Sequence, residues 1–484
     1  MPVLTPDGTQ VISVVDEAEV WLLALESRVE TRLDDGRHDF CMDPATGRVD
    51  GAVMVCWQGW SVPHMAWDRS DAVVCRLGDG ALTSHGTHQT TQPRFLSDGT
   101  LATLRDDHGW LNLWLGDQIA INEPFEHGNP TWGPGARSYA ASPSGHAIAV
   151  SRNESGFGRL QIWDRTSNSS VDIGRGVHSS LSWVGDTIVA IRSGARTPTQ
   201  VVAYTVDSDV ASGSATRRPL MVGPALGWES HSLVEPEVHR AVGPAGDVPL
   251  RRYVAGQGAA IVMVHGGPTD QWRVEFNPRI AYWCSRGFDV VVVDPRGSTG
   301  HGRAMAQALR GGWGVADVAD VEAAIRYVHA SGWSTPATTA LTGSSSGGLT
   351  VLGVLCGDHQ LVAAGIAAYP VSDIAALLEV DHRFEAHYPI SLVGEPGSSG
   401  YVDGSPCYRI DRLSTPLLLL HGTDDPVVPV TQSRELVARA PTGVIDYHEF
   451  DGEGHGFSSP ATRREEFARV EDFLRRHLTI TSHA

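Results

Sequence analysis

The sequence is most informative at residues 341–350, which read Leu341-Thr342-Gly343-Ser344-Ser345-Ser346-Gly347-Gly348-Leu349-Thr350. The segment contains the pattern Gly-x-Ser-x-Gly with Ser345 at its centre, and no neighbouring serine has Gly at both flanking positions. A short β-prone run precedes it (Thr335–Leu341), and a small apolar run that suits a buried helix follows it (Leu349–Cys356). Strand, sharp turn and helix in this order are typical of a nucleophile elbow. The pattern predicts that Ser345 projects from a strained turn beside which only Gly fits; an ordinary Gly- and Ser-rich loop is the alternative.

Length and charge restrict the class of protein. A chain of 484 residues is too long for one ordinary core, so we expect two domains. The net charge of −19 argues against nucleic acid and anionic membranes as partners. Every basic residue is Arg, which excludes a Lys nucleophile or Schiff base.

The cysteines and the N-terminal segment bear on the compartment. None of the six cysteines forms a Cys-x-x-Cys pair, which favours free thiols in a reducing compartment. The first residues have no basic region followed by a long apolar one, and no later run reaches the length of a membrane span. The sequence therefore predicts a soluble, cytoplasmic protein.

The first half of the chain, to about Ser232, consists of short β-prone runs such as Ala52–Cys56 and Thr187–Ile191. A weak sequence pattern recurs in this half. It consists of a Trp or Phe followed by a polar turn and a short apolar strand, as in Phe95-Leu96-Ser97-Asp98-Gly99. At roughly 45 residues per blade, this half would hold about five blades of a β-propeller. A pair of β-sandwiches or irregular β structure is the alternative.

The second half changes pattern near Val234–Glu237, after which strands alternate with helices. This alternation predicts a doubly wound, mostly parallel sheet. The apolar run Ala259–Val264 ends in His265-Gly266-Gly267-Pro268. A Gly-rich loop after a strand directs N–H groups into a cleft, so Gly267 and Ser346 are the candidate oxyanion donors. An ordinary tight turn is the alternative.

Two further segments supply an acid and a base. The apolar run Pro416–Leu420 leads into His421-Gly422-Thr423-Asp424-Asp425, and His455 lies between two glycines further on. The order Ser, Asp, His suits a triad in which His455 activates Ser345 and a carboxylate orients the imidazole. We assign that carboxylate to Asp425, with Asp424 as the rival. This constellation predicts acyl transfer to water and requires no metal or organic cofactor.

The run from Asp317 to Ala330 has apolar residues at helical spacing. It carries Asp317 and Asp320, which we place in its first turn, where carboxylates suit the helix dipole. Both are therefore interpreted as structural and not as catalytic.

With these residues in place, the second half resembles the prolyl oligopeptidase family of serine peptidases (S9), in particular its acylaminoacyl-peptidase-like branch. Besides the elbow, the matching segments are His265–Pro268, Phe276–Pro278, Ser285–Phe288, Arg296–Gly300, Gly312–Gly314 with Asp317 and Asp320, His421–Asp425, Val428–Pro429, Gln432–Ser433 and Glu453–Phe457. The resemblance places the catalytic acid at Asp425, four residues after the His of the strand end. It also implies a β-propeller before an α/β-hydrolase domain, so we expect domains at 1–232 and 233–484.

Three departures from the family matter. The residue after the nucleophile is usually aromatic but is Ser346 here, which would reshape the pocket for the substrate side chain. Relatives often carry Arg or Asn two residues after the catalytic Asp, where this chain has Val427, and we assign Val427 and His265 to the substrate pocket. The propeller half is also short. No paired-Glu motif for a free N-terminus is found, so dipeptidyl release is not supported.

The leading hypothesis is a serine peptidase that hydrolyses short peptides or (N-acyl)aminoacyl amides through an acyl-enzyme on Ser345. An esterase or amidase with the same triad is the second, and Val427 is its main support. A binding protein with a relict hydrolase domain is the third, against which the intact Ser345, Asp425 and His455 argue. The expected partner is a short peptide or acyl-amino-acid substrate. A homo-oligomer is possible, since relatives are often dimers or higher assemblies, but the sequence leaves the oligomeric state open.

Overall fold

The computed structural model describes residues 2–207, 213–224, 227–228, 233–256, 258–357, 360–379 and 383–479. The chain divides into two compact units. The first comprises Met1–Glu229, Arg273–Phe276 and Thr299–Ala304, and the second comprises Ser230–Trp272, Asn277–Ser298 and Met305–Ala484. Ser232, the last residue of the predicted first domain, lies outside the described residues.

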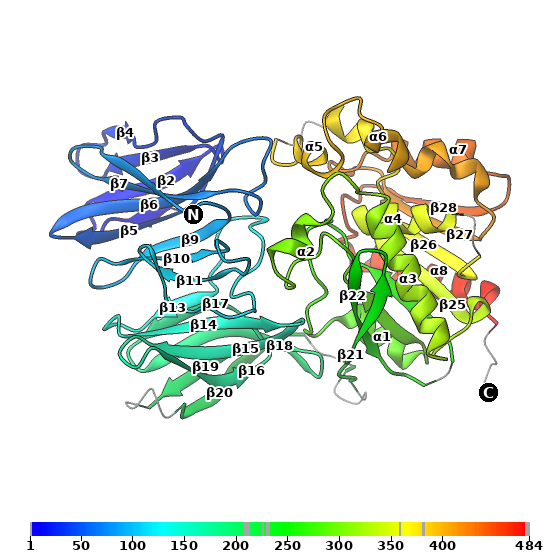
Figure 1. The fold of residues 1–484 in the computed structure, drawn as a ribbon, viewed down its shortest axis with the longest axis horizontal. Helices are drawn as coiled ribbons and strands as arrows, with labels where there is room; N and C mark the ends of the chain where they lie inside the picture. The colour runs from blue at the N-terminus through cyan, green and yellow to red at the C-terminus, as the bar shows by residue number, and fades with distance from the viewer. Residues whose placement is uncertain are drawn as a thin grey trace. The chain divides into compact units, whose positions relative to one another are not determined.

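The described part of the first unit contains five four-stranded antiparallel sheets that follow one another along the chain. Figure 1 shows them in order, from β1–β4 in blue to β17–β20 in green. The strands are β1 (Val3–Leu4), β2 (Gln10–Val15), β3 (Glu19–Ala24), β4 (Glu30–Arg32), β5 (Phe40–Val49), β6 (Ala52–Trp60), β7 (Asp71–Arg76), β8 (Leu82–His85), β9 (Thr90–Phe95), β10 (Leu101–Arg105), β11 (Asn112–Leu115), β12 (Gln118–Ile119), β13 (Tyr139–Ala141), β14 (Ala147–Glu154), β15 (Phe157–Asp164), β16 (Ser169–Arg175), β17 (Val177–Val184), β18 (Thr187–Gly194), β19 (Thr197–Val206) and β20 (Ala215–Val222).

Apolar side chains join each sheet to the next one. Ile12 and Val20 of the first sheet pack with Val55 and Trp57 of the second, and Cys56 of the second packs with Leu101 of the third. Similar clusters join the third sheet to the fourth and the fourth to the fifth. Small sheets that bury their faces only against neighbouring sheets are blades. The prediction of a β-propeller is therefore confirmed, and the β-sandwich alternative is wrong.

The second unit is built on an eight-stranded sheet of the described residues, in the order β21-β22-β24-β23-β25-β26-β27-β28. The pairs β21–β22 and β22–β24 are antiparallel, and the other pairs are parallel. Its strands are β21 (Glu237–Gly243), β22 (Gly246–Tyr253), β23 (Ala260–Val264), β24 (Asp289–Val293), β25 (Thr339–Ser344), β26 (Ala364–Ala368), β27 (Leu417–Gly422) and β28 (Ile445–Phe450). Every residue of β23 and β24 is buried, as continuous apolar runs in a parallel sheet predict.

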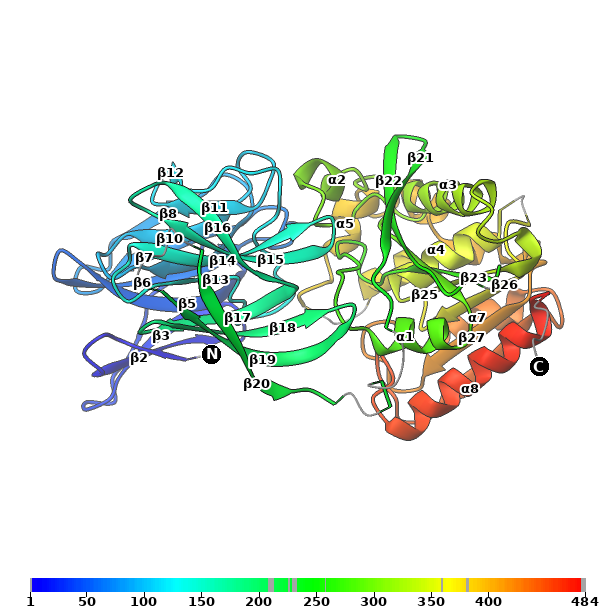
Figure 2. The ribbon, with the colours of Figure 1, turned by 90° about the horizontal axis from the view of Figure 1, so that it is seen from below.

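Helices cover both faces of this sheet. Figure 2 shows α3 and α4 on one face and α1 and α8 on the other. The helices are α1 (Pro278–Ser285), α2 (Arg303–Gln307), α3 (Ala316–Ala330), α4 (Ser346–Leu355), α5 (Tyr388–Val393), α6 (Gly400–Asp403), α7 (Thr431–Arg439) and α8 (Pro460–His477), with 3₁₀ turns at Pro336–Thr338, Ala375–Glu379, Pro406–Tyr408 and Ile410–Arg412. The prediction of an α/β-hydrolase domain is confirmed.

Two further observations concern the cysteines and the hydrophobicity of the helices. All six cysteines are free thiols, and all but Cys284 are buried. No helix in the described ranges is long and apolar enough to cross a membrane.

Asp320 corrects one prediction, since it lies in the second turn of α3 and not in the first. Asp317 and Asp320 are both buried, and each makes direct hydrogen bonds. Asp320 binds the Arg296 guanidinium at 2.9 Å, and Asp317 accepts hydrogen bonds from the Gly314 N–H and the Thr350 hydroxyl.

Candidate active site

Ser345 lies in a strained turn between β25 and α4, with φ 53° and ψ −122°. A non-Gly residue with positive φ is uncommon and is held only by close packing around it. That packing is visible at its two flanking glycines. A Cβ at Gly343 would lie 2.3 Å from the Gly347 carbonyl oxygen, and a Cβ at Gly347 would lie 2.5 Å from the His265 carbonyl oxygen. The expected clash beside Ser345 is therefore present at both positions, and the alternative of an ordinary loop is wrong.

The structure brings Ser345, His455 and Asp425 into one chain of hydrogen bonds. His455 Nε2 lies 3.0 Å from Ser345 Oγ, and His455 Nδ1 lies 2.7 Å from Asp425 Oδ2. The three residues follow β25, β28 and β27 respectively, at the carboxyl edge of the parallel sheet. Residues that are 110 positions apart meet here because parallel strands end at the same edge.

The Asp425 carboxylate has four polar neighbours. Its Oδ1 accepts the N–H groups of Val427 and Val428, both at 2.9 Å. Its Oδ2 faces His455, and His421 Nε2 lies 3.5 Å away. Burial alone would raise the pKa of Asp425, but the hydrogen bonds from His421 and His455 hold that pKa well below its usual range. The carboxylate therefore stays charged beside the imidazole.

Asp424, the rival acid, is exposed to solvent. Its carboxylate accepts a hydrogen bond from the Thr423 hydroxyl at 3.1 Å, and its own N–H donates to the Glu453 carbonyl. The geometry favours Asp425 over Asp424 as the acid next to the imidazole.

The loop after β23 passes beside the nucleophile. A Cβ at Gly266 would lie 3.6 Å from Ser345 Cβ, and Gly267 has φ 54°. His265 at its start is buried, with Nε2 2.8 Å from the Ser298 hydroxyl and Nδ1 near the Gly266 and Gly267 carbonyl oxygens. This histidine holds the loop, whereas the sequence assigned it to the substrate pocket, a role that stays a prediction.

Two residues that sequence reasoning did not single out also contact this constellation. His421 is fully buried, with Nδ1 2.7 Å from the Ser433 hydroxyl and Nε2 2.9 Å from the Val428 carbonyl. Tyr369, which follows β26, lies with its ring 4.8 Å from the His455 ring. His421 is part of the strand-end motif, but the sequence analysis gave it no role. No signal in the sequence points to Tyr369.

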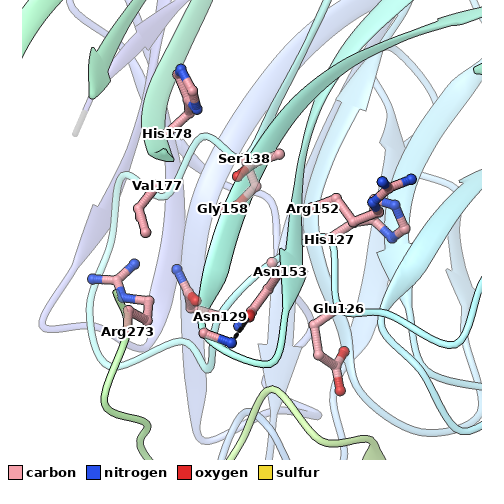
Figure 3. A pocket seen from close by; sticks show the side chains of 13 residues that line it. Glu126, His127, Asn129, Ser138, Arg152, Asn153, Gly158, Val177, His178 and Arg273 are labelled. Carbon is pink, nitrogen blue, oxygen red and sulfur yellow. Dashed lines mark hydrogen bonds between the residues drawn. The ribbon is translucent and has the colours of Figure 1, made fainter. Parts of the chain in front are cut away.

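A separate polar pocket lies within the first unit (Figure 3). Its lining includes Glu126 and Asn129 from the loop after β12, Asn153 of β14 and His178 of β17. Burial raises the pKa of Glu126 to about 7, although its carboxylate accepts the Leu111 N–H at 2.6 Å. Burial lowers the pKa of His178 to about 4, and this imidazole is hydrogen-bonded at both nitrogens, to the Gly176 carbonyl and the Tyr204 hydroxyl. The sequence did not predict this pocket.

Comparison with known proteins places the second unit in a family. Residues 274–481 match the model of the prolyl oligopeptidase family. The chain is 30% identical over 228 residues to dipeptidyl peptidase family member 6 of Caenorhabditis elegans and also 30% identical over 228 residues to the acylamino-acid-releasing enzyme of Homo sapiens. Each match covers 45% of this chain and 31% of the relative, so the matched region spans about a third of the length of these curated relatives.

A solved structure matches over the full length of the chain. It is a puromycin-hydrolyzing peptidase of Mycobacterium tuberculosis, with a TM-score of 0.90 and 29% sequence identity. The superposition covers 100% of this chain and 79% of that one, so the likeness includes the propeller as well as the hydrolase unit. Residues 274–481 therefore form a prolyl oligopeptidase family domain.

Proposed function

We propose that the chain is a serine peptidase that hydrolyses short peptides or (N-acyl)aminoacyl amides through an acyl-enzyme on Ser345. The observation that carries the proposal is the unbroken chain of hydrogen bonds from Asp425 through His455 to Ser345. A Ser hydroxyl is a weak nucleophile until a base within hydrogen-bond reach removes its proton. The distance of 3.0 Å between His455 Nε2 and Ser345 Oγ meets that requirement without the substrate.

In the first half-reaction, Ser345 Oγ forms a bond to the substrate carbonyl carbon while its proton passes to His455 Nε2. The imidazolium then gives this proton to the leaving amine as the C–N bond breaks, which leaves the acyl group on Ser345. In the second half-reaction, water repeats the attack with His455 as base and releases the acid. Asp425 orients the imidazole and stabilises its charged form throughout.

The negative charge that develops on the carbonyl oxygen requires fixed donors, each worth roughly 3 to 4 kcal/mol in other enzymes of this kind. The Ser346 N–H is a donor of the first turn of α4, where N–H groups have no acceptor within the helix. The second donor we assign to the loop at Gly267, where a Cβ on the preceding Gly266 would lie 3.6 Å from Ser345 Cβ. Both assignments agree with the loop positions used in α/β-hydrolases.

The names of the relatives support the substrate class. Two are called a dipeptidyl peptidase and an acylamino-acid-releasing enzyme, and the full-length structural match is called a puromycin-hydrolyzing peptidase. Two of these names contain the word peptidase, and the third describes the release of an acylamino acid. We further propose a cytoplasmic location, supported by six cysteines that all remain free.

A second candidate function is an esterase or amidase for small acyl groups. The observation that favours it is Val427, whose N–H is bound to Asp425 and whose apolar side chain cannot anchor a carbonyl of an extended peptide. Such an enzyme would use the same three residues on a smaller substrate.

The test is a paired hydrolysis assay with wild type, Ser345→Ala and Ser285→Ala. The substrates are p-nitroanilides of free and N-acylated amino acids, puromycin, and p-nitrophenyl esters of short acids. Ser285 is the matched control because it is an exposed serine of the same unit whose hydroxyl donates to the Tyr282 carbonyl. We expect anilide cleavage in wild type and Ser285→Ala, and a loss of at least about 1,000-fold in Ser345→Ala.

Three other outcomes would contradict the proposed function. Ester turnover with intact anilides would move the protein to the esterases. Activity that survives Ser345→Ala would remove Ser345 from the mechanism. A wild-type protein that neither cleaves these substrates nor reacts with an organophosphonate at Ser345 would revive the binding-protein hypothesis.

A further inference from the structure

Tyr369 shares an unusual backbone conformation with the nucleophile. Among the described residues of the second unit, Ser345 and Tyr369 are the two non-Gly residues with positive φ, at 53° and 38°. A bulky side chain in this region of backbone space is a real outlier, which persists only where the surroundings enforce it. Such strain often coincides with a functional contact, and the contacts of Tyr369 identify one.

The backbone around Tyr369 is bonded to the elbow at both of its ends. The Ser345 N–H donates to the Ala368 carbonyl at 3.1 Å, and the Val371 N–H donates to the Ser345 carbonyl at 3.3 Å. The Tyr369 N–H donates to the Leu420 carbonyl in β27, the strand that leads to Asp425, at 2.6 Å. The strained bend is therefore fixed to two of the three chain segments that carry the proposed triad.

The side chain of Tyr369 contacts the third segment. Its ring centroid lies 4.8 Å from that of His455 with the planes at 60°, and 5.4 Å from that of Phe457 with the planes at 87°. Burial raises the pKa of its hydroxyl, so the phenol stays neutral at neutral pH. Edge-to-face contacts at these distances are the preferred arrangement of aromatic rings.

His455 needs such a contact because its neighbours cannot hold it. It lies between Gly454 and Gly456, and neither glycine has a side chain to pack against the ring. Its two hydrogen bonds, to Ser345 and Asp425, fix the positions of Nε2 and Nδ1 but allow the ring to tilt about the line between them. Such tilting turns the Nε2 lone pair away from the hydroxyl proton of Ser345. A ring packed against the imidazole limits this tilting.

We propose that Tyr369 is a positioning residue that sets the plane of the His455 ring for proton transfer from Ser345. The inference rests on the proposed function of Ser345, His455 and Asp425. The ring of Tyr369 supplies the contact, and the backbone bonds to Ser345 and Leu420 hold the segment that carries this ring. No proton moves through Tyr369 itself.

The experiment compares Tyr369→Phe, Tyr369→Leu and Tyr369→Gly with wild type. Two quantities are measured: the rate of labelling of Ser345 by a fluorophosphonate, and kcat and KM on the best anilide substrate. The leucine and glycine variants should each lose about 10- to 100-fold in labelling rate and kcat, with KM changed less than about threefold. Tyr369→Phe keeps the ring and should retain most of the activity. Glycine accepts the positive φ without strain, so equal losses in both ring-less variants would assign the effect to the ring.

The variant Tyr401→Leu distinguishes a positioning role of Tyr369 from a purely structural one. Tyr401 is a buried tyrosine of the same unit whose hydroxyl donates to the Gly394 carbonyl at 3.1 Å. This control should lower the melting temperature without lowering the labelling rate of the folded protein. Wild-type labelling rates in folded Tyr369→Leu or Tyr369→Gly would overturn the proposal, as would an equal loss in Tyr401→Leu. If wild-type Ser345 itself is not labelled, the proposed function fails first, and the positioning role fails with it.

Discussion

Trp313 donates its indole N–H to the hydroxyl of Ser346, with 2.9 Å between Nε1 and Oγ, and both residues are buried. The side chain of Ser346, where the family resemblance led us to expect an aromatic residue, is therefore turned toward the protein interior. Its helix is fixed further by Thr350, whose hydroxyl donates to Asp317. The hydrogen bond between Trp313 and Ser346 anchors the start of α4.

Ser346→Ala should lower stability more than activity. The substitution leaves the Trp313 N–H buried without a partner, at a cost of about 1 to 3 kcal/mol. The backbone N–H of residue 346 remains in place, so we expect kcat/KM to change by less than roughly fivefold. Thermal unfolding and anilide hydrolysis measure the two effects. Trp313→Phe in the Ser346→Ala background should restore part of the lost stability, and a fall in activity with unchanged stability would contradict this interpretation.

The pair Asp425→Asn and Asp424→Asn tests which acid orients His455. An amide at position 425 cannot hold the imidazole in the required tautomer, so kcat should fall roughly 1,000- to 10,000-fold. Asp424 is exposed, and its carboxylate accepts a hydrogen bond from the Thr423 hydroxyl, so Asp424→Asn should stay within about twofold of wild type. Steady-state kinetics on one substrate decides between them. A large loss at 424 with a small one at 425 would reverse the assignment.

The sequence was sufficient for the parts of this site that depend on local chemistry. The glycines around Ser345, the strand-end loop at Gly267 and the Gly-flanked His455 each follow from what a short segment must do. The sheet that brings them together was predictable as well, because continuous apolar runs such as Ala260–Val264 are typical of buried parallel strands.

The remaining parts depend on contacts between distant segments, which no local pattern records. The ring of Tyr369 lies on His455 although 86 residues separate them, and the positive φ that aims it has no sequence signal. Asp320 was expected to act on a helix dipole, but its real partner is Arg296, 24 residues earlier in the chain. Glu126 acquires its raised pKa from burial among several blades, a property of the assembled propeller.

Gly347→Ala should prevent the elbow from forming. A Cβ there would lie 2.5 Å from the His265 carbonyl oxygen and 2.6 Å from the Val264 carbonyl oxygen. Both are backbone atoms of a central strand and its loop, so they cannot move away at low cost, and we expect a loss of about 3 kcal/mol or more. Soluble yield and melting temperature measure it. Gly133→Ala, where a Cβ would meet nothing within 4 Å, is the control and should behave as wild type.

Glu126 should make the stability of the propeller depend on pH. Its pKa is raised to about 7 in the folded protein, against about 4.3 in an unfolded chain. Between these values the folded state holds a proton that the unfolded state has released, so the free energy of unfolding falls as pH rises from about 4.5 to 7. Glu126→Gln does not titrate and keeps an oxygen for the Leu111 N–H. Because Glu126 is only partly buried, we expect the variant to be about 1 to 2 kcal/mol more stable than wild type at pH 8 and equal to it at pH 4.5. Melting temperatures at both pH values test this, with the variant of the exposed Glu26, Glu26→Gln, as the control. A difference between Glu126→Gln and wild type that is the same at both pH values would show that ionisation of Glu126 does not lower the free energy of unfolding.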